Sequence, residues 1–339
     1  MSRPGPGHVR GVRLLGTGAC LPRRRLANTD LMTMMDTTDE WIVQRTGIST
    51  RHISDPDAGE TTHDLGANAL RDALAASHLA ASDLDLILCA TMTAENNCPP
   101  VACMISQRLN AGRCGAMDLS AACCSWVYAL NTAAALVKTG AYNTVGVVGV
   151  DRLSKHVLYT TEGRSTAILF GDGAGAAIIK ATDDPSKGII AQSMHSNGER
   201  WTDIFIPWQR RDIPSELEIP DSQIGKVHMN GAAVFKFAVS TFPDLIAETL
   251  EKAGLRADEV DMYVCHQSNA RILKAARERF GLPEDKLYIN IDRVGNTVSA
   301  SVPLCLHELR TAGKIKDGQR VMFVAFGAGL TWGSSLWQL

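Results

Sequence analysis

The sequence lacks the features that mark several large classes of protein. Its 339 residues contain no run of about 18 apolar residues, so we expect no membrane-spanning helix. The first residues, Met1 to Gly11, hold no apolar stretch of the kind that a secretory signal needs. The formal net charge is only −2, so no overall positive field would attract nucleic acid. These absences favour a soluble protein that binds neither membranes nor nucleic acid.

Paired cysteines are missing as well. Nine cysteines occur, and none of them stands in a C-x-x-C pair or at the Cys and His spacings of a zinc site. An odd number of cysteines, scattered through apolar segments of a large chain, is not typical of a disulfide framework. We therefore expect free thiols, no metal and a reducing, cytoplasmic location. The nine are Cys20, Cys89, Cys98, Cys103, Cys114, Cys123, Cys124, Cys265 and Cys305.

An internal repeat organises the chain. The segment at 72–85, DALAASHLAASDLD, resembles the segment at 248–261, ETLEKAGLRADEVD, and the offset between them is 261 − 85 = 176. The apolar run that starts at Val145 resembles the run that starts at Val321, and 321 − 145 is again 176. Two separate pairs of segments that share one offset indicate a duplicated unit. We predict two halves of similar organisation, residues 1–183 and 184–339.

Both halves alternate apolar, strand-like runs with helical segments, which predicts an α/β fold with buried sheets. The segment at 123–138, CCSWVYALNTAAALVK, is apolar nearly all round, and its counterpart at 299–310 is apolar until its end. A helix without a polar face is usually a buried helix. Two buried helices between two sheets would make a five-layer sandwich, although the pattern by itself supports only a layered α/β fold.

Cys123 is the first candidate for chemistry. It lies where the strand-like stretch at 114–119 meets the start of the apolar helix. Free N–H groups and the positive end of a helix dipole favour a thiolate over a thiol. The same N–H groups can bind the oxyanion that forms when a thioester carbonyl is attacked. On position alone, a nucleophile and a small apolar filler explain Cys123 about equally well.

His266 and Asn296 are the candidates that could assist Cys123. His266 directly follows the apolar strand at 262–265, at the strand end where α/β sites gather, and could act as a donor or base. Asn296 follows Gly295, and a Gly-Asn pair usually forms a turn and has no catalytic role. Each residue alone is explained as well by a structural role. Because the repeat pairs Cys123 with Ser299, His266 and Asn296 both belong to the half opposite the nucleophile, as a site between the halves requires.

Two glycine-containing segments complete the candidates. The segment Gly327-Ala328-Gly329 follows the last expected strand, and it could present the Ala328 N–H to the same oxyanion or simply make a turn. The segment at 171–175, GDGAG, fits neither dinucleotide-binding nor P-loop spacing. We expect a tight turn inside the core there.

Six motifs occur in a fixed order along the chain. They are DEWIVQRTG at 39–47, AAC at 121–123, FGDGAG at 170–175, HQSNARI at 266–272, GNT at 295–297, and the pair AFG and TWG at 325–327 and 331–333. In this order and spacing, over nearly the whole chain, they resemble the β-ketoacyl-acyl carrier protein synthase III family and its relatives in secondary metabolism. The resemblance implies a thiolase-like five-layer α-β-α-β-α sandwich of two duplicated halves, and it strongly favours Cys123 as a nucleophile.

The resemblance also implies a ping-pong reaction. Cys123 would take an acyl group from acyl-CoA, and malonyl-acyl carrier protein would then lose carbon dioxide while His266 and Asn296 hydrogen-bond its thioester oxygen. The resulting carbanion would attack the acyl-cysteine and give a β-ketoacyl product. The backbone N–H groups of Cys123 and Ala328 would form the oxyanion hole. This chemistry needs no metal or redox cofactor. The resemblance also implies that the protein is a homodimer in the cytoplasm.

Substrate contacts can be assigned by the same resemblance. Three residues match the CoA-contacting positions of the family, and three lie near the mouth for pantetheine; they are Trp41, Arg45 and Arg164, and Ser268, Asn269 and Arg271. An aromatic face and guanidinium groups suit an adenine ring and phosphates, although each arginine could equally be a solvated surface charge. An acidic carrier protein would need a local basic patch, for which the candidates are Lys236, Arg271, Lys274, Arg277 and Arg279.

Several positions depart from the family pattern. Cys98 stands where the family commonly has a phenylalanine that reaches across the dimer into the acyl pocket. The segment Cys124-Ser125-Trp126 replaces a smaller, glycine-containing stretch, and Ala328 takes a usual glycine position. Val298 and Ser299 differ too. These changes leave the catalytic trio intact but alter the pocket, so the resemblance does not extend to a preference for acetyl groups.

Three other functions remain open at this stage. An acyltransferase of the same lineage would move the acyl group to oxygen or nitrogen, but such members tend to alter the asparagine, and Asn296 is present. A Cys-His hydrolase would need a carboxylate to orient His266, and no lone Asp or Glu follows it. A catalytically silent partner subunit would typically lose the cysteine, and Cys123 is present.

Overall fold

The computed structural model of this chain describes residues 10–339; most of the segment on which the secretory-signal expectation rests, residues 1–9, lies outside it. Two large sheets organise the fold, one with the strand order β1-β7-β6-β4-β5 and one with the order β11-β12-β13-β8. Two short hairpin-like pairs, β2 with β3 and β9 with β10, stand apart from them. None of the helices within 10–339 is long and apolar enough to cross a membrane.

The five-stranded sheet is drawn entirely from residues 11–182 and the four-stranded sheet from residues 188–338. The strands of the first half are β1 (Gly11–Cys20), β2 (Arg24–Ala27), β3 (Thr50–Ile53), β4 (Leu86–Ala90), β5 (Gly115–Leu119), β6 (Thr144–Arg152) and β7 (Asp172–Thr182). Those of the second are β8 (Gly188–Ser196), β9 (Ile204–Phe205), β10 (His228–Met229), β11 (Met262–Cys265), β12 (Arg320–Gly327) and β13 (Thr331–Gln338).

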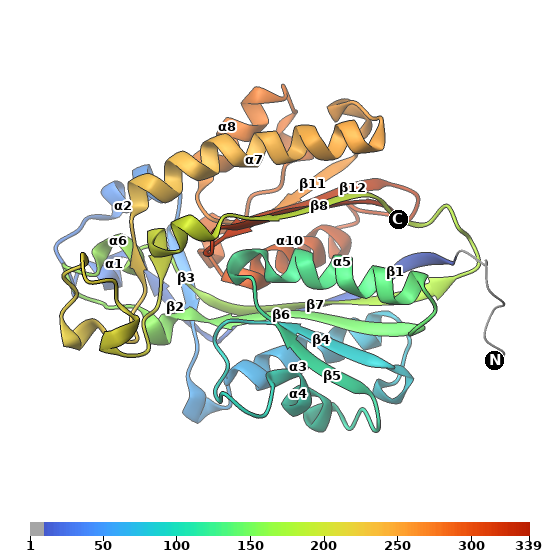
Figure 1. The fold of residues 1–339 in the computed structure, drawn as a ribbon, viewed down its shortest axis with the longest axis horizontal. Coiled ribbons are helices and arrows are strands. Elements are labelled where there is room, and N and C mark those ends of the chain that lie inside the picture. Colours follow the sequence, from blue (N-terminus) through green and yellow to red (C-terminus); the bar gives the residue numbers. More distant parts are fainter. Residues whose placement is uncertain (1–9) are drawn as a thin grey trace.

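Helices lie on both outer faces and between the two sheets (Figure 1). Helices α3 and α4 cover the first sheet, α7 and α8 cover the second, and α5 and α10 lie between the sheets. The predicted five-layer α-β-α-β-α sandwich is therefore confirmed. The helices are α1 (Asn28–Leu31), α2 (Asp39–Thr46), α3 (Thr62–Ala76), α4 (Val101–Leu109), α5 (Ser125–Lys138), α6 (Arg164–Ala167), α7 (Gly231–Ala253), α8 (Ala270–Arg279), α9 (Ile291–Val294) and α10 (Ser301–Thr311).

The offset between the two copies of the repeat recurs in the structure. Strand β4 starts at Leu86 and β11 at Met262, and 262 − 86 = 176. Short 3₁₀ turns precede the two central helices, η3 (Ala122–Cys124) before α5 and η10 (Val298–Ala300) before α10, and 298 − 122 gives the same value. The predicted boundary between residues 183 and 184 falls in the connection from β7 to β8 and stays a prediction.

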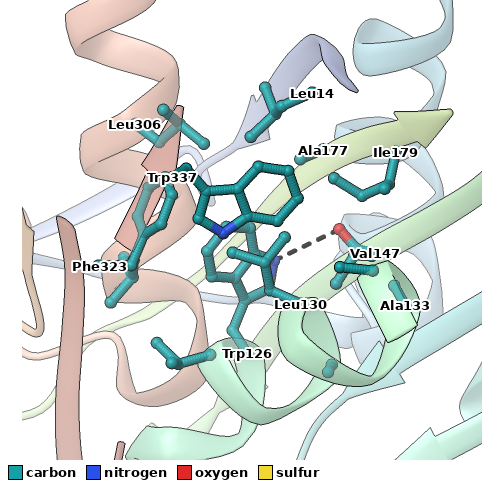
Figure 2. Packing of buried hydrophobic residues seen from close by; sticks show 14 of the residues in the cluster. Leu14, Trp126, Leu130, Ala133, Val147, Ala177, Ile179, Leu306, Phe323 and Trp337 are labelled. Atoms are coloured by element: carbon teal, nitrogen blue, oxygen red, sulfur yellow. Dashed lines mark hydrogen bonds between the residues drawn. The ribbon is translucent and has the colours of Figure 1, made fainter. Parts of the chain in front are cut away.

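The central layer joins the two halves through one apolar cluster (Figure 2). Trp126 of α5 is fully buried, its ring lies edge-on to Phe323 of β12 at 5.6 Å between centroids, and its indole N–H donates to the Val147 carbonyl at 3.4 Å. Trp337 of β13 is buried in the same cluster. Burying large aromatic side chains contributes about 2–3 kcal/mol each, so the two halves are stabilised as one unit.

Two element boundaries differ from the predicted ones. The apolar helix does not begin at Cys123, because Cys123 lies in the 3₁₀ turn and α5 begins at Ser125. The helix expected from Pro243 is only the second half of α7, which begins at Gly231. A proline inside a helix usually marks a start or a kink, so the sequence pattern points to the wrong residue there.

Candidate active site

The three catalytic candidates line one cleft between the halves. Cys123, His266 and Asn296 all border a space of about 650 Å³, open solvent at its mouth included. Most of the remaining lining is apolar: Leu169, Phe170, Ile204, Met229, Val234, Phe235, Phe237, Ile272, Phe326 and Leu330. The cleft therefore combines a few polar groups with dry walls, as an acyl-transfer site requires.

Local geometry holds Cys123 at the end of a tight turn. Ala122 adopts φ of +49°, the left-handed region that costs a residue with a side chain roughly 1 kcal/mol. Ser125 stabilises this turn, because its hydroxyl accepts from the Ala121 N–H at 2.7 Å and donates to the Ala122 carbonyl at 2.6 Å. Ser125 thus fixes the backbone directly before Cys123.

The surroundings of the Cys123 sulfur favour a thiol over a thiolate. Burial, followed by the charge of Asp151, raises the pKa of Cys123 to about 12, and only its own backbone N–H opposes the rise. Burial thus acts against the thiolate that the position before the helix was expected to favour. The α-helix begins two residues later, and Cys123 is only 8% exposed, so desolvation dominates.

His266 reaches the cleft from the end of β11. Its backbone N–H donates to Val324, and its ring packs edge-on against Phe326 at 5.6 Å. Burial lowers the pKa of His266 to about 3, so the imidazole is neutral at physiological pH. Its Nδ1 is sealed from solvent without a partner, and no carboxylate among residues 10–339 hydrogen-bonds the ring. Nε2 is therefore the nitrogen that a substrate can reach, and the orienting carboxylate of a Cys-His hydrolase is lacking in the part of the chain described.

Asn296 is oriented by its own turn. Its Oδ1 accepts from the Val298 N–H at 2.9 Å, while its backbone pairs with Leu169 and Gly171. Since the amide oxygen is engaged, Nδ2 is the group left to donate into the cleft. His266 and Asn296 can then place two donors on one oxygen atom of a substrate.

Gly327 at the end of β12 runs directly against the nucleophile. A Cβ on this residue would lie 2.7 Å from the Cys123 nitrogen, closer than real Cβ atoms come, and 3.1 Å from the Cys123 Cβ. The next residue, Ala328, lines the cleft, so its N–H remains the second candidate oxyanion donor beside that of Cys123. Glycine at 327 is what allows these two backbones to meet.

We predict that Gly327→Ala slows acylation of Cys123 at least about tenfold. The new methyl group must push the Cys123 backbone away, and overpacking of this kind typically costs about 1–3 kcal/mol. The rate of label transfer from acyl-CoA to the protein measures the effect. Gly198→Ala is the matched control, because nothing lies within 4 Å of its would-be Cβ. Equal acylation by Gly327→Ala and the wild type would contradict the prediction.

Comparisons with known proteins agree on one family. A model described as 3-oxoacyl-[acyl-carrier-protein] synthase III matches residues 117–198, and its C-terminal model matches residues 250–339. The β-ketoacyl-[acyl-carrier-protein] synthase III of Geobacillus kaustophilus is 43% identical over 324 residues, which cover 96% of this chain and 97% of that protein. The chain belongs to the β-ketoacyl-acyl carrier protein synthase III family.

Solved structures of this family share the fold. The crystal structure of 3-oxoacyl-[acyl-carrier-protein] synthase III from Aquifex aeolicus has a TM-score of 0.89 and 37% identity, with 97% of this chain and 100% of that chain covered. The priming β-ketosynthase from the R1128 polyketide biosynthetic pathway has a TM-score of 0.89 and 34% identity, with 99% of both chains covered. The likeness therefore includes a polyketide-priming enzyme as well as synthases named for the acyl carrier protein.

A second, more open space adjoins the catalytic cleft. It encloses about 860 Å³ and shares Leu169, Met229, Gly231, Phe235 and Asn269 with the cleft. Trp41, Arg45 and Arg271, three of the residues that the family resemblance assigns to CoA, line this outer space. The guanidinium groups of Arg45 and Arg164 each lie 4.6 Å from the centre of the Trp41 ring. These residues form a mouth suited to an aromatic ring and phosphates.

Ser268 and Asn269 lie between the mouth and His266. The Ser268 hydroxyl is sealed from bulk solvent, has no partner and belongs to a residue that lines the cleft, so its hydrogen-bonding capacity is unused. Asn269 is already engaged on both sides, since Oδ1 caps α8 at the Arg271 N–H and Nδ2 donates to the Arg45 carbonyl. Asn269 therefore joins the two walls of the mouth.

Within one chain, Cys98 lies outside both the cleft and the outer space. It is exposed, it lies in the loop before α4, and it lines neither space. The predicted acyl-pocket role of Cys98 stays a prediction that needs a second copy of the chain.

Sequence reasoning missed most of the apolar lining. Ile204, Met229, Phe235 and Phe237 come from the segment between β8 and the middle of α7, which carries no recognisable periodicity. The motifs that carry the family resemblance do not contain these four residues, so the resemblance did not indicate them either. Within residues 10–339 no cluster of three or more His, Cys, Asp or Glu side chains is placed to hold a metal ion.

Proposed function

We propose that this protein catalyses the decarboxylative condensation of an acyl group with a malonyl thioester, through an acyl-Cys123 intermediate. Acyl-CoA would donate the acyl group, malonyl-acyl carrier protein would supply the extender, and the product would be a β-ketoacyl thioester. The observation that carries this proposal is the convergence of Cys123, His266 and Asn296 on one apolar cleft. We expect no metal or redox cofactor, because thioester exchange and decarboxylation need only proton transfer and hydrogen bonds.

Each residue has a distinct part in this reaction. In the first half, the Cys123 sulfur forms the bond to the acyl carbon as its proton leaves and CoA departs as the thiol; the backbone N–H groups of Cys123 and Ala328 bind the oxyanion. In the second half, the malonyl carboxylate leaves as carbon dioxide. His266 and Asn296 then donate to the thioester oxygen, where the negative charge of the carbanion accumulates. That carbanion attacks the acyl carbon and releases Cys123.

Acylation with labelled acyl-CoA, followed by addition of malonyl-acyl carrier protein, tests the proposal. Stable labelled Cys123 and a β-keto product only after malonyl addition would support condensation. Release of free acid would indicate a hydrolase, and transfer to an added alcohol or amine without loss of carbon dioxide would indicate the related acyltransferase. A protein that takes up no label from any acyl-CoA would be a silent subunit.

The carrier protein would dock on a smaller basic patch than the sequence suggests. Arg277 pairs with Glu284 at 2.7 Å and Arg279 with Asp244 at 2.9 Å. Lys236, Arg271 and Lys274 are exposed and make no ion pair in the described residues. We propose that these three cations, on α7 and α8 beside the mouth, meet the acidic carrier protein.

We propose that the protein is a cytoplasmic homodimer. Strand β5 pairs only with β4, so its outer edge is free, and Met117 on this strand is 43% exposed. A free edge with an exposed apolar side chain is typically covered by another chain. Cys98 leads into α4, which packs on β5, so pairing of two copies along β5 would bring Cys98 toward the partner. Sedimentation analysis measures this association.

Cys98→Phe is expected to narrow the range of acyl groups toward short chains. The larger side chain would fill acyl-pocket space in the partner subunit if the dimer forms as proposed. Relative rates of Cys123 acylation with acetyl-CoA and longer acyl-CoAs measure the change. Cys103→Phe, also exposed but on α4, serves as the control. An unchanged chain-length preference would count against a role of Cys98 in the pocket.

A further inference from the structure

Asp151 is a fully buried carboxylate for which the reaction above has no use. It lies at the end of β6, it is 0% exposed, and no cation pairs with it among the described residues. Five donors surround it instead. Oδ1 accepts from Thr91 Oγ1 at 3.2 Å, Met92 N at 2.9 Å and Thr93 Oγ1 at 2.9 Å, and Oδ2 accepts from Ser299 N at 3.1 Å and Ser299 Oγ at 2.6 Å.

This donor set fits an ionised side chain. Each oxygen receives a backbone N–H, from Met92 on one side and Ser299 on the other, and only a carboxylate accepts fully at both oxygens. Burial raises the pKa of Asp151, while the hydrogen bonds from Ser299, Met92 and Thr93 oppose that rise. A buried anion without a cation is costly and needs such compensation. A buried carboxylate without a paired cation is the kind of group that proteins keep for a function despite its cost in stability.

The carboxylate joins three segments that lie around the active site. Residues 91–93 follow β4 and start the loop that leads to Cys98. Ser299 is the internal counterpart of Cys123 and lies in η10, which packs against η3. In the same turn the Val298 N–H orients the amide of Asn296. A tether from Asp151 to Ser299 therefore fixes Val298 and, through it, Asn296.

We propose that Asp151 is a positioning residue: its carboxylate anchors the turn that orients the Asn296 amide for the condensation step. The two hydrogen bonds from Ser299 to Asp151 Oδ2 hold this turn, and the Val298 N–H in the same turn donates to Asn296 Oδ1.

Asp151→Asn tests the anchor by a comparison of the two half-reactions, so this readout rests on the proposed function. An amide cannot accept hydrogen bonds at both of its terminal atoms, so the Ser299 turn loses part of its support. We expect condensation from preformed acyl-enzyme to slow at least about tenfold, while acylation of Cys123 by acyl-CoA stays within about twofold of the wild type.

Asp172→Asn is the matched control. Asp172 is also 0% exposed and also accepts from two backbone N–H groups and two hydroxyls, those of Ser54 and Ser154. Its hydrogen-bond partners in the described residues do not belong to the turn at 297–300. The control should lose similar stability without a selective loss of condensation. Unchanged condensation in Asp151→Asn, or an equal loss of condensation in both variants, would overturn the anchor.

Ser299→Ala tests the anchor while it keeps the charge. It removes the 2.6 Å hydrogen bond to Oδ2 and the 2.9 Å approach of the same hydroxyl to the Ala90 carbonyl. We expect the condensation step to slow at least about tenfold, because Asn296 shifts, while acylation of Cys123 stays within about twofold of the wild type. Normal condensation in Ser299→Ala would overturn the anchor, even if Asp151→Asn does not fold. Absence of condensation in the wild type would instead identify a failure of the proposed function.

Discussion

Cys123→Ala is expected to abolish acylation. No other thiol among residues 10–339 lines the cleft. Loss of a nucleophile typically removes three or more orders of magnitude of rate. Intact-protein mass spectrometry after incubation with acyl-CoA measures the result: the wild type gains one acyl group and the variant none.

Cys20→Ala is the control for this experiment. Cys20 lies at the end of β1, half-buried and outside the cleft, so its removal should leave acylation intact. Unimpaired product formation by Cys123→Ala would refute the assignment of the nucleophile and, with it, the whole reaction proposed for the cleft.

His266→Ala and Asn296→Ala are expected to retain acylation and lose condensation. In the proposed reaction, both side chains donate to the oxygen on which charge develops only after the malonyl group has lost carbon dioxide. Removal of one such donor typically costs about 10²–10³-fold in rate. The measurement is two-stage: labelled acyl-enzyme is formed and isolated, malonyl-acyl carrier protein is added, and β-keto product is counted.

The pH dependence sharpens the prediction for His266. Because burial lowers the pKa of His266 to about 3, the ring should remain a neutral donor throughout the range of the assay. The condensation step, started from preformed acyl-enzyme, should therefore show no inflection near pH 6.5, where an exposed histidine titrates. An inflection there that disappears in His266→Ala would show that the ring is protonated during turnover and would contradict this assignment.

Asn143→Ala is a suitable control for Asn296→Ala, because Asn143 is exposed and bonds only outside the cleft. Equal loss of acylation and condensation in Asn296→Ala would indicate a disturbed fold. Equal retention of both would show that the cleft does not use this amide.

Periodicity and repetition predicted a layered α/β fold of two similar halves, and the family resemblance supplied the order of its five layers. The constant offset between the two copies can be recognised in the sequence because corresponding helices and strands bury the same face in both copies. Burial restricts those positions to apolar residues, so the pattern is preserved. The apolar segment at 123–138 shows its burial for the same reason. Cys123, His266 and Asn296 could be singled out by their positions at element ends, and the family resemblance turned them into a site.

Three features were decided by tertiary structure alone. Burial of the Cys123 sulfur near the charge of Asp151 on β6 raises the pKa of Cys123, and a position before a helix says nothing of either cause. The close approach of Gly327 to Cys123 joins residues from opposite halves. Part of the apolar wall of the cleft comes from the segment between β8 and the middle of α7. Sequence patterns indicate which side chains of a segment are buried. The pKa of Cys123 and its contact with Gly327 depend on which segments pack together, and only the folded chain determines that.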